Sequence, residues 1–165
     1  MRLVEWFGLP LGTLAPDLDL PNEFGKVVHL KELIGTKPVL LAFYVSDFGV
    51  MCSVEMIAFR DYYQELKELC HLLGISTNTT YSHGAWSGSL RLPFPLLSDL
   101  DGEVSKRFNV WPVDDTGYLE GRSLRAVFII DLKGSISYCW APDDPGLEPD
   151  YNELLRVLRD LKGGV

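Results

Sequence analysis

Short runs of uncharged, apolar residues are the feature that most restricts the fold of this chain. The clearest is PVLLAFY at residues 38–44. Two further runs of this kind are HLLGIS at 71–76 and AVFIID at 126–131, of which the second is uncharged until its last residue. At this length such a run fits a strand that is buried on both faces, as in a largely parallel central sheet. The chain is therefore expected to build its core around a covered sheet.

Amphipathic segments separate these runs. Within residues 51–69, apolar side chains recur at three- and four-residue steps, which predicts one long helix. The apolar positions are Val54, Ile57, Ala58, Tyr62, Leu66 and Leu69. A further amphipathic helix is expected over residues 150–161, and shorter helices within 80–89 and 103–108, the latter preceded by PLLSD at 95–99.

Two hairpins complete the order of elements. Residues 15–33 alternate apolar and polar side chains around a turn-rich centre, and residues 126–131 and 135–141 flank a short turn. Strands that alternate with helices, followed by an antiparallel pair and a last helix, predict an α/β sandwich with a mixed central sheet. A thioredoxin-like fold with an N-terminal β-hairpin extension is the best match to this order.

The size and charge of the chain limit its partners. Its 165 residues show no repeat or linker, so a single domain over residues 1–165 is expected. The formal net charge is -8, and Lys and Arg form no run, which argues against nucleic acid or an anionic membrane as the partner.

Location and redox state follow from what the sequence lacks. No apolar stretch approaches the roughly 20 residues that span a bilayer, and the first residues make a poor signal peptide. Three cysteines at wide spacing do not make a secreted disulfide framework. A cytoplasmic protein is therefore expected.

Cys52 is the first candidate for chemistry. It follows the strand of residues 38–44 after a short loop, near the predicted start of a helix. Ligands of open α/β sheets bind beyond the carboxyl ends of the strands. Unpaired N–H groups and the helix dipole at a helix N-terminus also favour the nucleophilic thiolate over the thiol. The alternative, a buried cysteine that serves as a small apolar residue, is common.

The segment FYVSDFGVMC at residues 43–52 resembles the active-site loop of the peroxiredoxins, the alkyl hydroperoxide reductase/thiol-specific antioxidant family. That loop has the pattern aromatic–Pro–x–x–x–Thr–x–x–Cys, and Cys52 falls on its peroxidatic cysteine. Similar segments cover residues 15–30, 52–61, 72–76, 92–110 and 121–138. The resemblance implies a thiol peroxidase, without a cofactor or metal, that reduces hydrogen peroxide or organic hydroperoxides.

Further site residues are implied by the same resemblance. Arg125 matches the arginine that contacts the thiolate and the peroxide, although alone it would read as a surface arginine at a strand start. Glu55 matches a glutamate that orients active-site arginine, and a first-turn helix acid is the equal alternative. Tyr44 matches an aromatic residue of the pocket, or it belongs to the core at a strand end.

Two positions depart from the family pattern. Val45 replaces the proline that shields the thiolate, and Gly49 replaces the threonine whose hydroxyl aligns the peroxide. The loss of one preorganised transition-state hydrogen bond costs about 10²- to 10³-fold in rate, so a slowed peroxidase is expected rather than an inactive one. The competing hypothesis is a peroxiredoxin-like redox sensor or interaction module with little turnover.

The other two cysteines are interpreted as residues that pack in the core. Cys70 ends the predicted long helix and Cys139 lies in a predicted strand, while no resolving cysteine follows at residue 57 or in the C-terminal LKGGV. A one-cysteine mechanism with an external thiol reductant, thioredoxin-like or of low molecular weight, is therefore expected. The family resemblance also implies a homodimer. The three histidines show no metal-ligand spacing.

Overall fold

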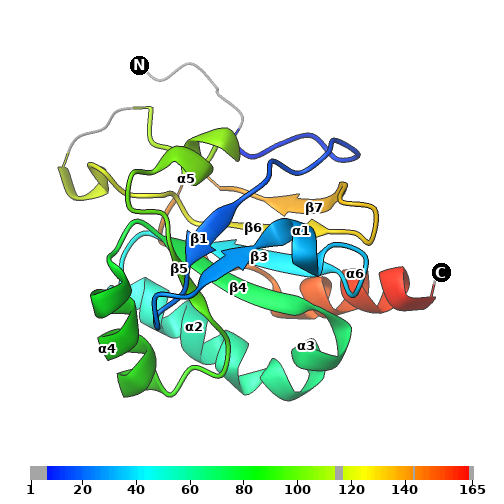
Figure 1. The fold of residues 1–165 in the computed structure, drawn as a ribbon, viewed down its shortest axis with the longest axis horizontal. Coiled ribbons are helices and arrows are strands. Elements are labelled where there is room, and N and C mark those ends of the chain that lie inside the picture. The colour runs from blue at the N-terminus through cyan, green and yellow to red at the C-terminus, as the bar shows by residue number, and fades with distance from the viewer. Residues whose placement is uncertain (1–6, 114–116, 143, 164–165) are drawn as a thin grey trace.

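The computed structural model describes residues 7–113, 117–142 and 144–163 (Figure 1). Its centre is a five-stranded mixed sheet in the order β5-β4-β3-β6-β7. The strands are β3 (Val39–Phe43), β4 (His71–Ser76), β5 (Leu96–Ser98), β6 (Ala126–Ile130) and β7 (Ile136–Trp140). Strands β3, β4 and β5 are parallel, and β6 and β7 run antiparallel to their neighbours. The α/β fold with a mixed sheet is confirmed.

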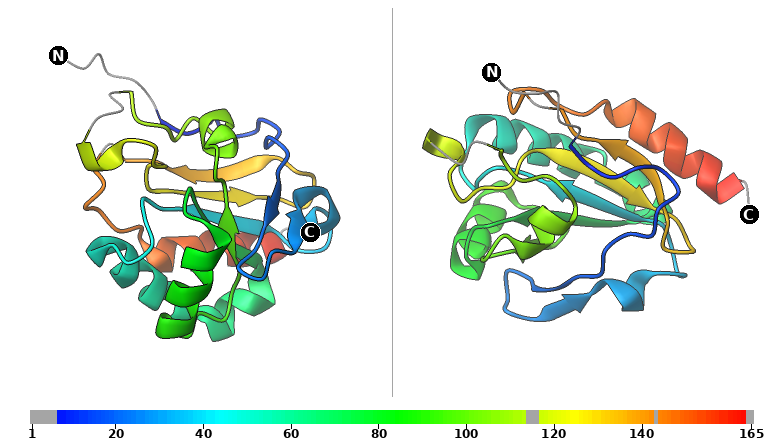
Figure 2. Two further views of the ribbon diagram at one scale, coloured as in Figure 1. Left: turned by 60° about the vertical axis from the view of Figure 1, so that its left-hand side comes forward. Right: turned by 90° about the horizontal axis from the view of Figure 1, so that it is seen from above.

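Helices and a hairpin cover the two faces of this sheet (Figures 1 and 2). The helices are α1 (Leu30–Leu33), α2 (Val50–Asp61), α3 (Tyr63–Leu69), α4 (Thr80–Leu90), α5 (Glu103–Arg107), the 3₁₀ turn η1 (Gly117–Leu119) and α6 (Tyr151–Gly163). One buried cluster joins the sheet to α2, α3 and α6. The other joins it to α1, α5 and the antiparallel hairpin of β1 (Asp19–Pro21) and β2 (Val27–His29).

Strand β3 shows why its sequence carries no charge. All five of its side chains are buried. Successive side chains of a strand point to opposite faces. Leu40 and Ala42 therefore pack into the cluster beneath α2, whereas Leu41 and Phe43 pack into the cluster beneath the hairpin. The central strand thus belongs to both cores.

The long helix predicted over residues 51–69 is wrong in two respects. It is broken at Tyr62, where α2 ends and α3 begins. At the break, the Tyr62 ring stacks on Tyr151 of α6, with ring centroids 5.7 Å apart. The buried face of α2 also differs from the predicted one: Val54 is 41% exposed, and the buried residues are Cys52, Glu55, Met56 and Phe59. The pattern of apolar residues could not place a buried glutamate on the core face.

The edge of the sheet contains a strand that was not predicted as a separate element. Leu96–Ser98, within PLLSD, forms β5 beside β4 before the chain enters α5.

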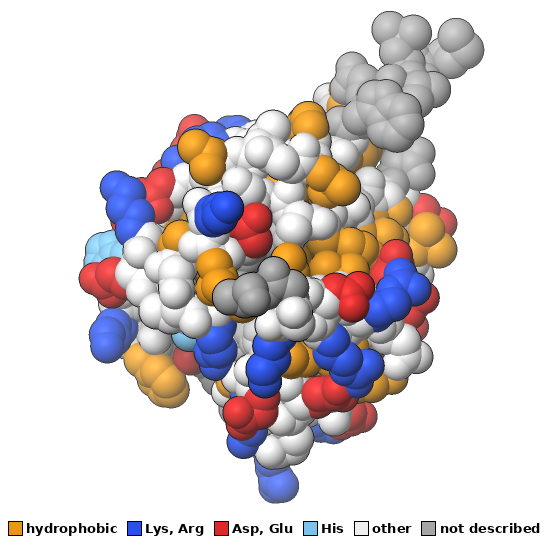
Figure 3. All heavy atoms as spheres, turned by 90° about the vertical axis from the view of Figure 1, so that its right-hand side faces the viewer, with side chains coloured by type: hydrophobic (Ala, Val, Ile, Leu, Met, Phe, Trp, Pro, Cys, Tyr) orange, Lys and Arg blue, Asp and Glu red, His pale blue; other side chains and the backbone are white. Residues whose placement is uncertain are grey.

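The N-terminal segment interpreted as a poor signal peptide includes residues 1–6, which lie outside the described residues. Among the described residues, no helix combines the length and apolar character needed to cross a membrane. Acidic and basic side chains are interspersed on the face drawn in Figure 3.

Candidate active site

The sheet register brings two distant segments to one edge. Phe43, the last residue of β3, pairs with Ala126, the first residue of antiparallel β6. The loop that leaves β3 toward α2 therefore lies beside Arg125, which precedes β6. This pairing explains how residues 73 positions apart in the sequence, Cys52 and Arg125, come into contact.

Cys52 lies in the first turn of α2, whose N-cap is Gly49. The residue is 3% exposed, and its Sγ accepts a hydrogen bond from Arg125 Nη2 at 3.5 Å. A cationic donor next to sulfur at a helix N-terminus stabilises the thiolate form. The local geometry therefore suits a nucleophile.

Arg125 is held from two sides. Its Nη1 donates to Glu55 Oε1 at 3.1 Å, and its Nε and Nη2 donate to the carbonyl oxygen of Pro145 at 3.2 and 3.1 Å. Burial opposes the charge of the guanidinium, but Glu55 and the sulfur of Cys52 outweigh it and raise the pKa of Arg125. The planar guanidinium thus reaches the thiol in a fixed orientation.

Glu55 is fully buried, and its Oε2 has no hydrogen-bond partner among the described residues. Burial raises the pKa of Glu55 to about 7, against the opposing attraction of Arg125. Burying a carboxyl group in this way costs desolvation energy, and its contact with Nη1 holds Arg125 beside the thiol.

The raised pKa of Glu55 predicts a pH-dependent stability. The folded protein holds this proton up to pH about 7, whereas the unfolded chain releases it near the ordinary value of 4.5. The free energy of unfolding should therefore fall as pH rises from about 4.5 to 7, by on the order of 3 kcal/mol from this group. Urea denaturation at several pH values should show a shallower slope for Glu55→Gln. Equal slopes for the two proteins would contradict this prediction.

A pocket of about 570 Å³ opens above the thiol. Its lining is formed by the loop after β3, the start of α2, the segment before β6 and the chain after β7: Val45, Ser46, Gly49, Val50, Met51, Cys52, Arg122, Arg125, Pro145 and Gly146. The structure thus brings Cys52, Gly49 and Arg125 together in one cavity. Tyr44 and Glu55 do not line it, and both are fully buried beside it.

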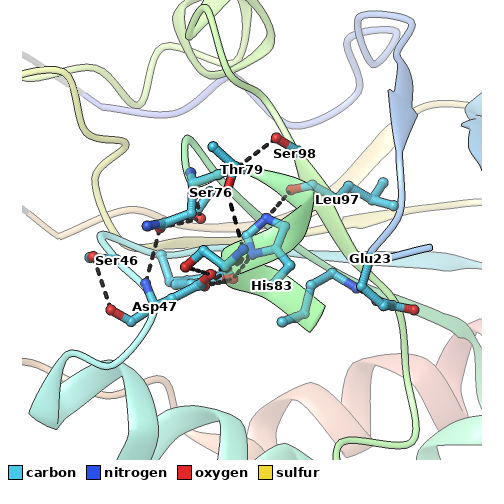
Figure 4. Close-up of polar contacts among 12 residues, drawn as sticks. Glu23, Ser46, Asp47, Ser76, Thr79, His83, Leu97 and Ser98 are labelled. Carbon is cyan, nitrogen blue, oxygen red and sulfur yellow. Dashed lines mark hydrogen bonds and ion pairs between the residues drawn. The ribbon is translucent and has the colours of Figure 1, made fainter. Parts of the chain in front are cut away.

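A buried polar network that sequence reasoning missed supports the loop after β3 (Figure 4). His83 of α4 is fully buried, with Nε2 3.0 Å from the carbonyl oxygen of Leu97 and Nδ1 2.8 Å from Asp47 Oδ2. The hydroxyls of Tyr44 and Ser82 donate to the same carboxylate at 2.6 and 2.8 Å. Both ring nitrogens lie within hydrogen-bond distance of acceptors, so the imidazole is held from two sides.

The network fixes a strained turn. The backbone N–H of Asp47 donates to Asn78 Oδ1 at 3.0 Å, which ties the loop to the end of β4. The next residue, Phe48, has φ of 66°, in the left-handed region that costs a non-glycine residue about 1 kcal/mol or more. Gly49 follows at the pocket wall. Asp47 therefore holds a backbone shape that places the first turn of α2.

Comparison with known proteins decides the family. Residues 11–139 match the sequence model of the AhpC/TSA family. The chain belongs to this family of peroxiredoxins. It is 36% identical to the chloroplastic 2-Cys peroxiredoxin BAS1 of Hordeum vulgare, over 98% of this chain and 80% of the relative. It is 35% identical to the chloroplastic peroxiredoxin Q of Triticum aestivum, over 91% of this chain and 67% of the relative.

Solved peroxiredoxin structures share the fold. The reduced 2-Cys peroxiredoxin of Plasmodium vivax has a TM-score of 0.81 at 29% identity, with 93% of this chain and 82% of that chain covered. Peroxidoxin BcpB of Mycobacterium tuberculosis has a TM-score of 0.78 at 26% identity, with coverage of 93% and 97%. The thioredoxin-like fold expected from the sequence is confirmed.

In this peroxiredoxin, both departures from the family loop lie in the pocket wall. Val45 is 7% exposed, so an apolar side chain still covers the position of the family proline. Gly49 has φ of -66° and ψ of 145°, a conformation open to any residue. Its lack of a side chain is therefore not required by the backbone.

Among the described residues, no group of three or more His, Cys, Asp or Glu side chains is placed to hold a metal ion. The three cysteines are free, with Cys52 and Cys70 buried and Cys139 partly buried.

Proposed function

We propose that this peroxiredoxin is a thiol-dependent peroxidase whose reactive group is the Cys52 thiolate. The sulfur attacks the terminal oxygen of a hydroperoxide, the O–O bond breaks, and the departing oxygen takes a proton to leave as water or an alcohol. Cys52 is left as a sulfenic acid. The observation that carries the proposal is the contact of Cys52 Sγ with the Arg125 guanidinium at 3.5 Å inside a pocket.

The guanidinium has two roles in this step. It stabilises the thiolate before the attack, and its donors face the site where negative charge develops on the departing oxygen. Because Glu55 and Pro145 hold it in place, little reorganisation is needed during the reaction.

An external thiol completes the cycle in this proposal. Two thiol molecules reduce the sulfenic acid, which yields one disulfide, one water and the free Cys52. Cys139 packs into the cluster on the face of the sheet opposite Cys52, and burial raises its pKa. Both features support a one-cysteine mechanism.

Cys70 is placed no better for resolution. It precedes β4, whereas Cys52 follows the carboxyl end of parallel β3, so the two lie at opposite ends of these strands, roughly 15 Å along the sheet. Burial raises the pKa of Cys70 to about 12, which keeps it in the unreactive thiol form.

The test is consumption of hydrogen peroxide with dithiothreitol as the reductant. The wild type should turn over, and Cys52→Ser should match the rate without enzyme. Cys70→Ser and Cys139→Ser serve as matched controls, and each should keep the wild-type rate. Equal rates for the wild type and Cys52→Ser would refute the peroxidase, and loss of turnover in either control would refute the one-cysteine mechanism.

A gain of function is expected at Gly49. A threonine there would place Cβ 3.4 Å from Cys52 Sγ and 3.2 Å from the carbonyl oxygen of Ser46, a tight fit. Its hydroxyl would supply the donor and acceptor that align the peroxide in the family. Gly49→Val has the same shape without the hydroxyl. Stopped-flow oxidation of Cys52 should be at least about tenfold faster in Gly49→Thr than in Gly49→Val. Similar rates would show that a hydroxyl at this position does not assist the reaction.

The predicted homodimer and cytoplasmic location stay predictions. The word chloroplastic in the names of several relatives applies to those proteins.

A further inference from the structure

The lining of the active-site pocket has more cationic than anionic groups, although the protein is acidic. The chain has a net charge of -8, yet the pocket lining contains two arginines, Arg122 and Arg125, and no carboxylate among the described residues. A concave, low-dielectric site with an excess of one sign of charge concentrates ligands of the opposite sign.

The two arginines differ in how their charges are balanced. Arg125 contacts Glu55 and the sulfur of Cys52. Arg122 has no ion-pair partner within residues 7–113, 117–142 and 144–163. Its backbone N–H donates a hydrogen bond to the carbonyl oxygen of Leu119. The Arg122 side chain is partly exposed at the pocket wall. Its guanidinium is therefore the charge that a bound ligand can neutralise.

The rest of the pocket suits an organic ligand. Val45, Val50, Met51 and Pro145 give it an apolar wall, and its volume is about 570 Å³. Pockets for organic molecules have volumes of about 300–1,000 Å³, whereas hydrogen peroxide has only two heavy atoms. Gly49 places no side chain next to the thiol, where a Cβ would lie 3.4 Å from Cys52 Sγ.

We propose that Arg122 forms an anion subsite, and that the preferred substrate class is an organic hydroperoxide that carries a carboxylate. The apolar body lies along the wall, the carboxylate accepts hydrogen bonds from the forked guanidinium, and the hydroperoxide group reaches Cys52. This inference rests on the proposed peroxidase function, and it adds the recognition of the part of the substrate that does not react.

The test compares two substrates that differ in charge and by one methyl group: 4-carboxycumene hydroperoxide and its methyl ester. Steady-state kcat/KM with dithiothreitol is measured for the wild type, Arg122→Gln and Arg122→Lys. The control is Arg156→Gln, which removes the same charge from an exposed position on α6. The readout is the ratio of kcat/KM for the acid to that for the ester, which cancels general effects of a substitution on the reactive cysteine.

We expect a ratio of about five in the wild type, because a partly exposed ion pair contributes on the order of 1 kcal/mol. The ratio should fall to about one in Arg122→Gln, stay between these values in Arg122→Lys and be unchanged in Arg156→Gln. The preference should appear in KM, as expected for uniform binding, and should weaken at high salt.

A wild-type ratio of one or less, or the same ratio in Arg122→Gln as in the wild type, would overturn the subsite. Loss of the preference in Arg156→Gln would also overturn it, since the effect would then come from the overall charge. The ester separates this inference from the proposed function: if the ester is consumed no faster by the wild type than by Cys52→Ser, the peroxidase itself is refuted.

Discussion

Arg125→Gln should lower the rate constant for oxidation of Cys52 by about 10²- to 10³-fold, the usual effect of losing one preorganised donor in an active site. The substitution removes the Nη2 contact with Cys52 Sγ and the charge that stabilises both the thiolate and the departing oxygen. Stopped-flow fluorescence after mixing with hydrogen peroxide gives the rate constant directly.

The same substitution leaves Glu55 buried without its cation, so folding must be controlled. The double variant Arg125→Gln/Glu55→Gln replaces the ion pair by two neutral amides and should fold with near wild-type stability. It should be as slow as Arg125→Gln. A double variant that regains the wild-type rate would show that Arg125 acts on the fold and not on the reaction.

Asp47→Ala should lower the free energy of unfolding by about 3–5 kcal/mol, because it removes the acceptor shared by three side chains and each unsatisfied buried group costs about 1–3 kcal/mol. His83 loses the acceptor of Nδ1, and the hydroxyls of Tyr44 and Ser82 lose theirs, all at buried or partly buried positions. For a chain of this length the loss corresponds to a fall in Tm of about 10 °C. Urea denaturation and calorimetry at neutral pH measure both quantities.

Asp61→Ala is the matched control, since Asp61 is exposed and its pair with Arg60 has a separation of 3.4 Å. Its effect should stay within about 0.5 kcal/mol. If Asp47→Ala is too unstable to purify, Asp47→Asn keeps acceptor oxygen at the site and should lose less. A loss below 1 kcal/mol in Asp47→Ala would contradict the stabilising role of the buried network.

Most strands of the sheet were predictable, because each is encoded by a short run of consecutive apolar residues. The uncharged runs at residues 38–44, 71–76 and 126–131 became β3, β4 and β6. The helix break at Tyr62 was not predictable, because the periodicity of the apolar residues continues through it, and the ring that Tyr62 stacks on belongs to α6, almost ninety residues away. Strand β5 also escaped prediction because three residues carry little periodicity, and its identity comes from pairing with β4.

In the candidate site, too, some residues were recognisable from the sequence and others only from the structure. Cys52 was recognisable from its place after a strand and before a helix, and Arg125 from a family resemblance. Asp47 and His83 gave no comparable signal, because an aspartate in a loop and a histidine in a helix are ordinary at the surface. Their partnership arises from the packing of α4 against the end of the sheet. Arg122 likewise gains meaning only from the pocket that it lines.

Peroxide should oxidise Cys52 and leave Cys70 and Cys139 unmodified. Intact-protein mass spectrometry after one equivalent of hydrogen peroxide, without a thiol and with dimedone as the trap, measures this. We expect one dimedone adduct per chain, mapped to Cys52 by peptide analysis and absent in Cys52→Ser. An unmodified Cys52, or an adduct on Cys70 or Cys139 in its place, would contradict this expectation.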